Sequence, residues 1–286
     1  MTIPLFVLMI SMLPVTSSTE VRALAPEAIH EMVSELSLDE RVTVFRDSLS
    51  SGLAAEIDDE RIRAFMRGVG QEAQIKAVNQ FLQENPTYET LLLKQERVGR
   101  RWNDKPDRML VRYRAEPHAM YIRWERGGPN ARRQLLFDSS KEPNRFLVNE
   151  GGLLGIVSIT LDLDSSLVGR ETNHRLTDLS FQTFLDYLEA DRQVLLANGE
   201  STQPKVERVT EHRGERMWEN VFETPGTEEY YAPKARFLFD MSTGVPRLVE
   251  IFETDGTLRE RFEFKNIRWI ALGDDVFDRD NDDYSF

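Results

Sequence analysis

The first part of the chain has the hydrophobic period of amphipathic helices. Apolar residues recur about every 3.6 positions over residues 20–83. Ser37 and Glu40 have the spacing of a capping box, which starts a helix. Gly70 interrupts the pattern, and Pro86 ends it because a proline disfavours helical geometry in the residue before it. We therefore expect an N-terminal segment of several helices.

From Tyr88 onward the period changes to two. In residues 109–113 and 157–163, apolar side chains alternate with arginines in the first run and with Ser, Thr and Asp in the second. Alternation of this kind predicts strands with one buried face. Asp255-Gly256, between two apolar runs, predicts a hairpin turn.

One further helix is expected inside the β-region. Residues 178–197 carry an apolar stripe, and Asn198-Gly199 can close the helix at its C-terminal end. The order is then helices, about six strands, one helix and about five strands, which favours antiparallel pairing. We predict a mainly β (α+β) fold: a curved antiparallel half-barrel of about eleven strands, with a helix over the concave face and an N-terminal helical segment.

The N-terminus has the features of an export signal. Residues 3–15 are almost wholly apolar, about the length of a signal-peptide core and short for a membrane span. No Lys or Arg precedes Arg22, so a buried N-terminal helix is the alternative. The expected division is a signal peptide at 1–18, a helical extension at 19–70 and a half-barrel domain at 71–286. The mature protein would be periplasmic or secreted, with no integral membrane span.

Composition removes several classes of function. The chain of 286 residues has no cysteine, so we expect no disulfide, thiol catalysis, Cys-ligated zinc or lipidated N-terminal cysteine. Its net charge of -13 repels phosphate backbones, so we expect no nucleic-acid partner. Hydrophobic residues make up 40% of the chain, enough for a sizeable core.

Several short segments resemble a known family in their order along the chain. They are Pro117 with Tyr121-Ile122-Arg123-Trp124, Phe146-Leu147-Val148-Asn149-Glu150-Gly151-Gly152, Leu161-Asp162-Leu163-Asp164 and the tail from Phe277 to Phe286. Together they are similar to DUF1571, a family of exported bacterial proteins of unknown function, over about residues 72–286. The resemblance extends to the LolA/LolB lipoprotein-carrier superfamily and implies a half-open antiparallel barrel with helices over its mouth. It implies no catalytic residues.

Aromatic side chains provide the candidate binding site. In a half-barrel they would converge on one side and could line an apolar cavity for an acyl chain. The alternative is an ordinary packed core, to which aromatic stripes usually belong. The candidates are Trp124, Phe137, Phe146, Phe181, Phe184, Phe237, Phe239, Phe262 and Phe264.

Charged residues give weaker signals. The arginines at 108, 112, 114 and 123 could meet an anionic headgroup or an acidic partner, but we expect a solvated outer strand face on which they pair with Glu and Asp. Asp278, Asp280 and Asp282 have the spacing that opens a calcium loop, yet the glycine and the closing glutamate of such a loop are missing. The four histidines are scattered, so we predict neither a metal site nor a cofactor.

These observations favour a noncatalytic periplasmic binding protein that carries a lipid or lipoprotein acyl chain. The alternative is an envelope protein-interaction or sensing module with a filled core. An enzyme is the third possibility, and no converging polar cluster in the sequence supports it. A cavity on the order of a few hundred Å³ would favour the carrier, whereas a filled core would favour the interaction module.

Overall fold

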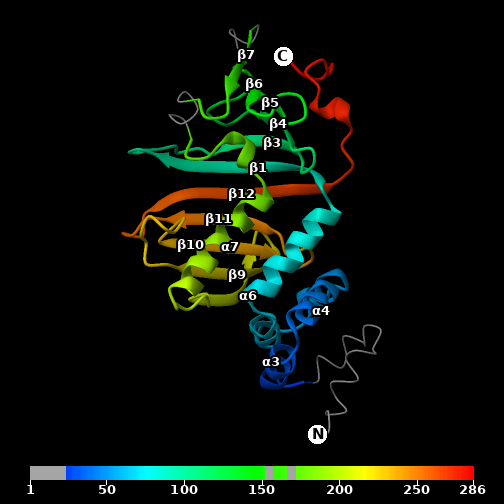
Figure 1. Ribbon diagram of the computed structural model, residues 1–286, viewed down its shortest axis with the longest axis vertical. Coiled ribbons are helices and arrows are strands. Elements are labelled where there is room, and N and C mark those ends of the chain that lie inside the picture. The colour runs from blue at the N-terminus through cyan, green and yellow to red at the C-terminus, as the bar shows by residue number, and fades with distance from the viewer. Residues whose placement is uncertain (1–23, 152–156, 166–171) are drawn as a thin grey trace.

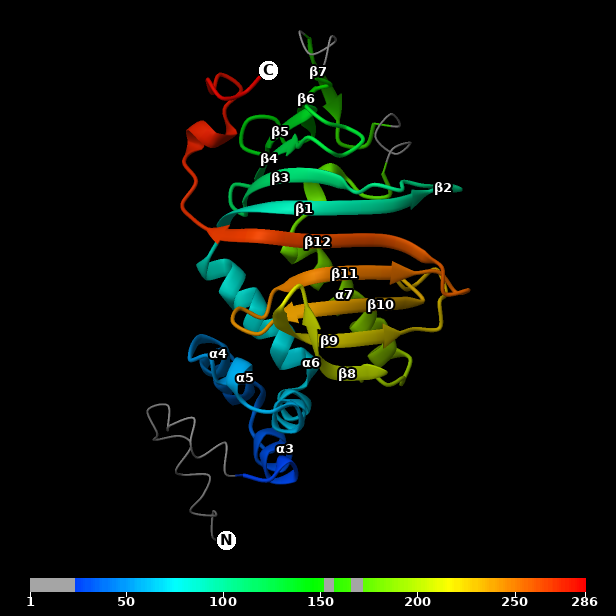
Figure 2. The same cartoon turned by 180° about the vertical axis from the view of Figure 1, so that it is seen from behind.

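The computed structural model describes residues 24–151, 157–165 and 172–286. The predicted signal segment at 1–18 lies outside these residues. Figures 1 and 2 show a broad sheet with helices on one face and at one end.

All strands belong to one antiparallel sheet of twelve strands. Its order is β7-β6-β5-β4-β3-β1-β12-β11-β10-β9-β8, so β7 and β8 are the edges and the sheet remains open. The strands are β1 (Thr87–Val98), β2 (Arg101–Trp102), β3 (Asp107–Arg114), β4 (Ala119–Trp124), β5 (Gln134–Asp138), β6 (Arg145–Asn149), β7 (Ser158–Asp162), β8 (Val206–His212), β9 (Glu215–Glu223), β10 (Lys234–Asp240), β11 (Pro246–Phe252) and β12 (Leu258–Trp269).

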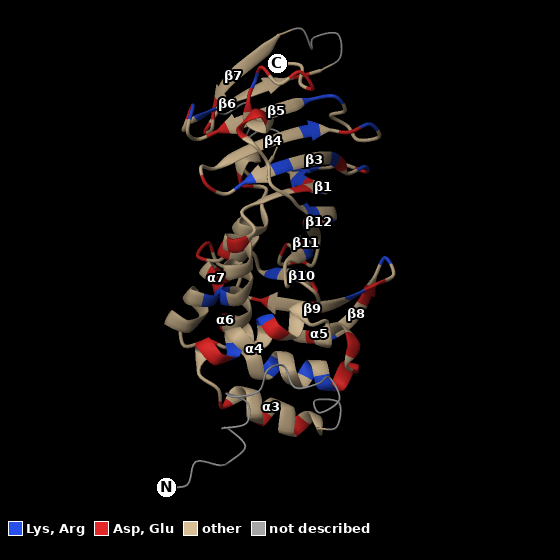
Figure 3. Ribbon diagram, turned by 90° about the vertical axis from the view of Figure 1, so that its right-hand side faces the viewer, with Lys and Arg blue, Asp and Glu red and all other residues tan. Residues whose placement is uncertain are grey.

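The alternation of side chains gives the sheet two different faces. We call the face that carries Leu92, Val111, Ile122 and Phe262 the inner face, because these side chains belong to the main core. The opposite, outer face carries mostly charged side chains and two small apolar clusters. Figure 3 shows, edge-on, that the helices at Asp59–Glu84 and Phe181–Ala197 lie on one side of the sheet, while the other labelled helices lie beyond its end.

The N-terminal helices form as their local sequence predicts. They are α3 (Pro26–Ser34), α4 (Leu38–Ser50), α5 (Leu53–Glu56) and α6 (Asp59–Glu84). The capping box at Ser37 and Glu40 is confirmed, and α6 ends just before Asn85-Pro86. Gly70 breaks α6. Its backbone angles, φ 74° and ψ 157°, form a conformation that residues with a Cβ atom rarely adopt.

Helix α7 (Phe181–Ala197) lies over the inner face, as predicted (Figure 1). It follows a short 3-10 turn (Leu176–Asp178), begins at Ser180, whose side chain accepts from the backbone of Thr183, and ends at Asn198. A second 3-10 turn (Asp274–Phe277) lies in the C-terminal tail. In the described ranges, no helix combines the length and the hydropathy needed to cross a membrane.

The predicted fold class is confirmed: a mainly β, antiparallel protein with a helix over one face and an N-terminal helical segment. The structure has one strand more than expected, the two-residue β2, which pairs only with β1. The hairpin turn at Asp255-Gly256 is present between β11 and β12, with Gly256 at φ 80°.

Candidate functional site

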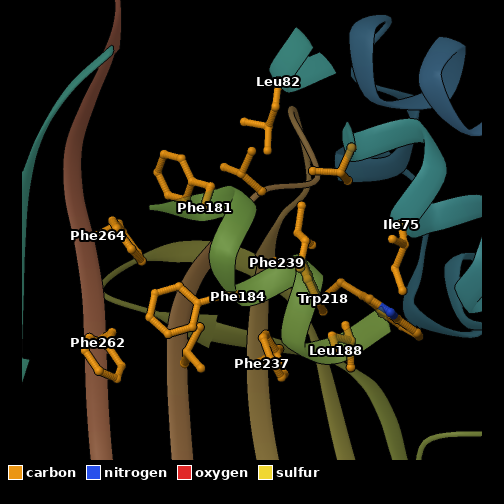
Figure 4. Packing of buried hydrophobic residues seen from close by; sticks show 14 of the residues in the cluster. Ile75, Leu82, Phe181, Phe184, Leu188, Trp218, Phe237, Phe239, Phe262 and Phe264 are labelled. Carbon is orange, nitrogen blue, oxygen red and sulfur yellow. The ribbon is translucent and has the colours of Figure 1, made fainter. Parts of the chain in front are cut away.

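The core between α7 and the inner face is built from aromatic pairs. Phe181 of α7 contacts Phe264 with ring centroids 4.4 Å apart, and Phe184 contacts Phe262 at 4.8 Å. Phe237 and Phe239 of β10, two strands away from β12, stack on each other with ring centroids 5.5 Å apart. Figure 4 shows these side chains filling the space between the helix and the strands.

The nine side chains predicted to line a cavity all belong to this single core cluster. Their relative exposure ranges from 0% for Phe181 to 9% for Phe239. They come from β4, β5, β6, α7, β10 and β12, so the topology does place them on one side of the sheet. Only three of them, Phe184, Phe237 and Phe239, line either of the cavities found under α7.

The cavities under α7 are small. One lies between α6, α7 and β9–β10 and has a volume of about 20 Å³. The other, beside Tyr187 and Tyr231, also measures about 20 Å³. A space of this size accepts roughly one water molecule, whereas an acyl chain needs at least ten times more. Among the described residues, the space between α7 and the sheet is therefore filled by side chains.

A larger open groove of about 500 Å³ lies away from the inner-face aromatics, between α4, α6 and the β10–β11 turn. Arg46 and Glu84, both in its lining, form an ion pair across it at 2.6 Å. Asp47, Gln80 and Ser242 add further polar groups. Its mixed, charged lining does not suit an acyl chain.

A buried polar cluster occupies one end of the inner face, where β1 and β12 meet the segment that leads to α7. Lys94 contacts Glu96 at 2.8 Å, and both side chains are no more than 6% exposed. Glu260 accepts from Tyr231 at 2.6 Å and lies 2.9 Å from His174 Nε2. Lys94 and Glu96 are close in sequence, but His174, Tyr231 and Glu260 lie far from them and from one another. No local spacing predicts that these side chains meet, so the sequence analysis missed the cluster.

Electrostatics within the cluster favour the ionised form of Glu260. Burial raises its pKa, but the hydrogen bond and charge of His174, the hydroxyl of Tyr231 and the charge of Arg259 outweigh burial and lower the pKa to about 2. Burial also raises the pKa of Asp107, despite the nearby charge of Lys94.

The cluster connects the loop before α7 to the sheet. The Thr172 hydroxyl donates to Glu96 at 3.1 Å, and the side-chain Nδ2 of Asn173 donates to Glu260 at 3.1 Å. Groups buried at this depth must be paired to offset their desolvation. The observed bonds provide that pairing and hold the loop in place.

The outer face of the upper strands is covered by the C-terminal tail. Tyr284 stacks on Tyr121 and accepts from Arg112 at 3.2 Å, while Arg114 lies over the ring of Phe277 at 4.7 Å. The predicted pairing of the arginine stripe is confirmed at three positions: Arg112 with Glu89, Arg114 with Asp138 and Asp274, and Arg123 with Glu125. The acidic tail thus supplies one of the partners.

The two edges of the sheet differ. The N-terminal helices lie against the β8 edge: Arg67 of α6 pairs with Glu207 at 2.8 Å, and Arg216 of β9 donates to the Ala55 carbonyl and to Asp59. At the other end, in the part of the chain that the structure describes, no strand pairs with the free side of β7. Val157 and Ile159 are 65% and 50% exposed there.

Comparison with known proteins identifies the family. The model of the family DUF1571, "Protein of unknown function", matches residues 85–286. The chain belongs to this family. A search of curated proteins gave no match.

Solved structures with a similar arrangement share little sequence. A LolA superfamily protein from Nitrosomonas europaea is 10% identical, with a TM-score of 0.32, and the match covers 72% of this chain and 98% of that one. MucB is 15% identical, with a TM-score of 0.43 and coverage of 72% and 62%. A putative outer membrane lipoprotein-sorting protein domain from Vibrio parahaemolyticus is 9% identical, with a TM-score of 0.33 and coverage of 72% and 97%.

Proposed function

We propose that this DUF1571 protein is a noncatalytic protein-interaction module of the bacterial envelope. The filled space under α7 carries the proposal, because cavities of about 20 Å³ there leave no room for an acyl chain. The apolar segment at 3–15 supports export to the periplasm.

The buried polar cluster does not favour an enzyme. Lys94, Glu96, His174 and Glu260 are each paired with one another or with neighbouring hydroxyl and amide groups. Their side chains are at most 6% exposed, so a substrate would have to displace the loop at 172–174 to reach them. A structural role for the cluster fits this burial better than catalysis.

Lipid carriage is the competing proposal, and it requires α7 to move away from the sheet. The aromatic pairs that join α7 to β12 oppose that movement, since each buried aromatic ring stabilises the closed form by roughly 2–3 kcal/mol.

Native mass spectrometry distinguishes the two proposals. The protein is purified from the periplasm and measured before and after incubation with vesicles of phosphatidylethanolamine and phosphatidylglycerol. We expect the mass of the chain alone in both samples. A stoichiometric lipid adduct that survives purification would overturn the proposal and favour a carrier.

Crosslinking provides the positive test. Photoreactive residues placed singly at exposed positions around the molecule should yield discrete protein-sized crosslinked products in intact cells. Lack of such products from every position would contradict an interaction module.

A further inference from the structure

Within residues 24–151, 157–165 and 172–286, no strand pairs with the free side of β7. The N–H of Leu163 donates to the carbonyl of Asn144, just before β6, at 2.9 Å. This bond shows which residues of β7 direct their backbone groups toward β6. The backbone N–H and C=O groups of successive residues in an antiparallel strand point to opposite sides, so those of Ile159 and Leu161 also point toward β6. The backbone groups of Ser158 and Thr160, and the N–H of Asp162, consequently point away from the sheet.

The apolar surface of the inner face continues to this edge. Ile159 lies directly opposite Val148, and Leu161 lies opposite Phe146, so all four side chains are on the inner face. Val148 and Phe146 are 6% and 3% exposed, but Ile159 is 50% exposed. Burial therefore stops one strand short of the end of the sheet, where an added strand would continue it.

In residues 157–163 the edge lacks three of the features that protect strand edges, namely lysine, proline and a bulge. Proteins block open edges with lysine, proline, a bulge or a covering element. Residues 157–163 contain neither lysine nor proline, and the pairing of β7 with β6 is regular. At the other end of the sheet, by contrast, helices and the Arg67–Glu207 ion pair cover β8.

Charge argues against a second copy of the chain as the occupant. Two molecules of net charge -13 repel each other, and each would bring Asp162 and Asp164 to the contact. These two side chains are 79% and 77% exposed, and each already has one partner, Arg145 for Asp162 and Arg175 for Asp164, in an ion pair that is itself exposed to solvent. Pairing two five-residue strands would also bury far less than the roughly 1,200 Å² of a stable dimer. A basic, extended segment of another protein fits both the backbone and the charge.

We propose that β7 binds an extended polypeptide segment by strand addition. The segment pairs with Ser158, Thr160 and Asp162, places alternate apolar side chains beside Ile159 on the inner face, and carries Lys or Arg near Asp162 and Asp164. This inference rests on the proposed interaction function and names one surface for it.

A designed peptide tests the inference on the full mature chain. The probe is a fluorescent peptide in which valine and threonine alternate between terminal lysines, and binding is measured by fluorescence anisotropy. In an antiparallel addition, like every other pairing of this sheet, its valines would face inward beside Ile159 and the N–H groups of its threonines would face β7. N-methylation of the threonines should abolish binding, whereas N-methylation of the valines should change it less than about twofold.

Variants of β7 provide the matching change in the protein. Thr160→Pro removes one outward N–H from an edge strand, where proline is tolerated, and Ile159→Lys places a charge in the contact. Each should weaken peptide binding at least about tenfold, which corresponds to roughly 1.4 kcal/mol. Leu196→Lys is the control, because Leu196 at the end of α7 is 49% exposed and away from β7. Circular dichroism checks that each variant folds. If Thr160→Pro does not fold, the test of peptide binding uses Ile159→Lys alone.

The outcomes are separable. Equal binding by the two N-methylated peptides, unchanged binding by Ile159→Lys, or no binding at millimolar peptide would overturn the inference. A concentration-dependent dimer that Ile159→Lys abolishes would overturn the choice of occupant. If crosslinks in cells form at other surfaces but not at β7, this inference fails while the interaction function stands.

Discussion

Tyr284 lies flat against Tyr121, with ring centroids 3.9 Å apart and ring planes 11° apart. The hydroxyl of Tyr284 donates to the Val276 carbonyl at 2.6 Å and accepts from Arg112 at 3.2 Å. This contact attaches the last residues of the chain to the outer face of β3 and β4. It gives a physical role to a tail that is only a degenerate pattern in the sequence.

Removing the Tyr284 ring should release the tail. Tyr284→Ala loses the stacking and both hydrogen bonds, so we expect the free energy of unfolding to fall by about 2–3 kcal/mol. Tyr284→Phe keeps the ring and should cost only about 1 kcal/mol. Urea denaturation measures both variants, with the exposed Arg279→Ala as control. A Tyr284→Ala variant as stable as wild type would contradict a docked tail.

The aromatic pairs under α7 should dominate the stability of the covered core. Phe184 is 1% exposed and contacts Phe262 at 4.8 Å, so Phe184→Ala leaves a cavity and should destabilise the protein by about 3–5 kcal/mol. Leu196→Ala on the same helix is the control and should cost less than about 0.5 kcal/mol. Thermal and urea unfolding provide the comparison. Similar losses for the two variants would mean that α7 is only loosely held.

The buried cluster predicts a specific dependence of stability on pH. The pKa of Glu260 is about 2 in the folded protein, below its ordinary value of 4.5. The ionised carboxylate therefore stabilises the fold above pH 4.5, and this contribution is lost as the pH falls from 4.5 toward 2.

The Glu260→Gln variant measures that contribution. At pH 7 it should be less stable than wild type by about 3 kcal/mol, and the difference should shrink steadily below pH 4.5. Glu228→Gln, at an exposed position, should follow the wild-type curve. A constant difference between wild type and Glu260→Gln from pH 7 to pH 2.5 would show that Glu260 is not held ionised.

Local features of the fold were predictable because local sequence determines them. A capping box at Ser37, a proline at position 86 and Asp255-Gly256 act within a few residues, and each produced the expected boundary. The strand pattern likewise predicted the main strands and the face on which the nine aromatic side chains lie. The volume of the cavities among those side chains depends on how α7 packs against the sheet, and no local sequence pattern determines that packing.

Long-range polar contacts were not predictable from the sequence. Lys94, His174 and Glu260 are separated by at least one strand or helix in the chain, and nothing in their spacing links them. The same holds for the tail, where Phe277 is 0% exposed although its neighbours are mostly acidic. Such contacts depend on the strand order, and only the folded structure shows that β1 and β12 are neighbours.

Gly70 should be required for the break in α6. Its φ of 74° and ψ of 157° are accessible mainly to glycine, and a Cβ there would lie 3.2 Å from Arg41 Nη1. We expect Gly70→Ala to lower the free energy of unfolding by about 2–3 kcal/mol, because it strains the joint between the N-terminal helices and the sheet. Gly199→Ala is the matched control: Gly199 also has a positive φ, 71°, but a Cβ there meets nothing within 4 Å, so about 1 kcal/mol is expected. Urea denaturation of both variants tests the difference. If Gly70→Ala is no more harmful than Gly199→Ala, the helix can pass through this point unbroken, and the two halves of α6 are not held at a fixed angle by Gly70.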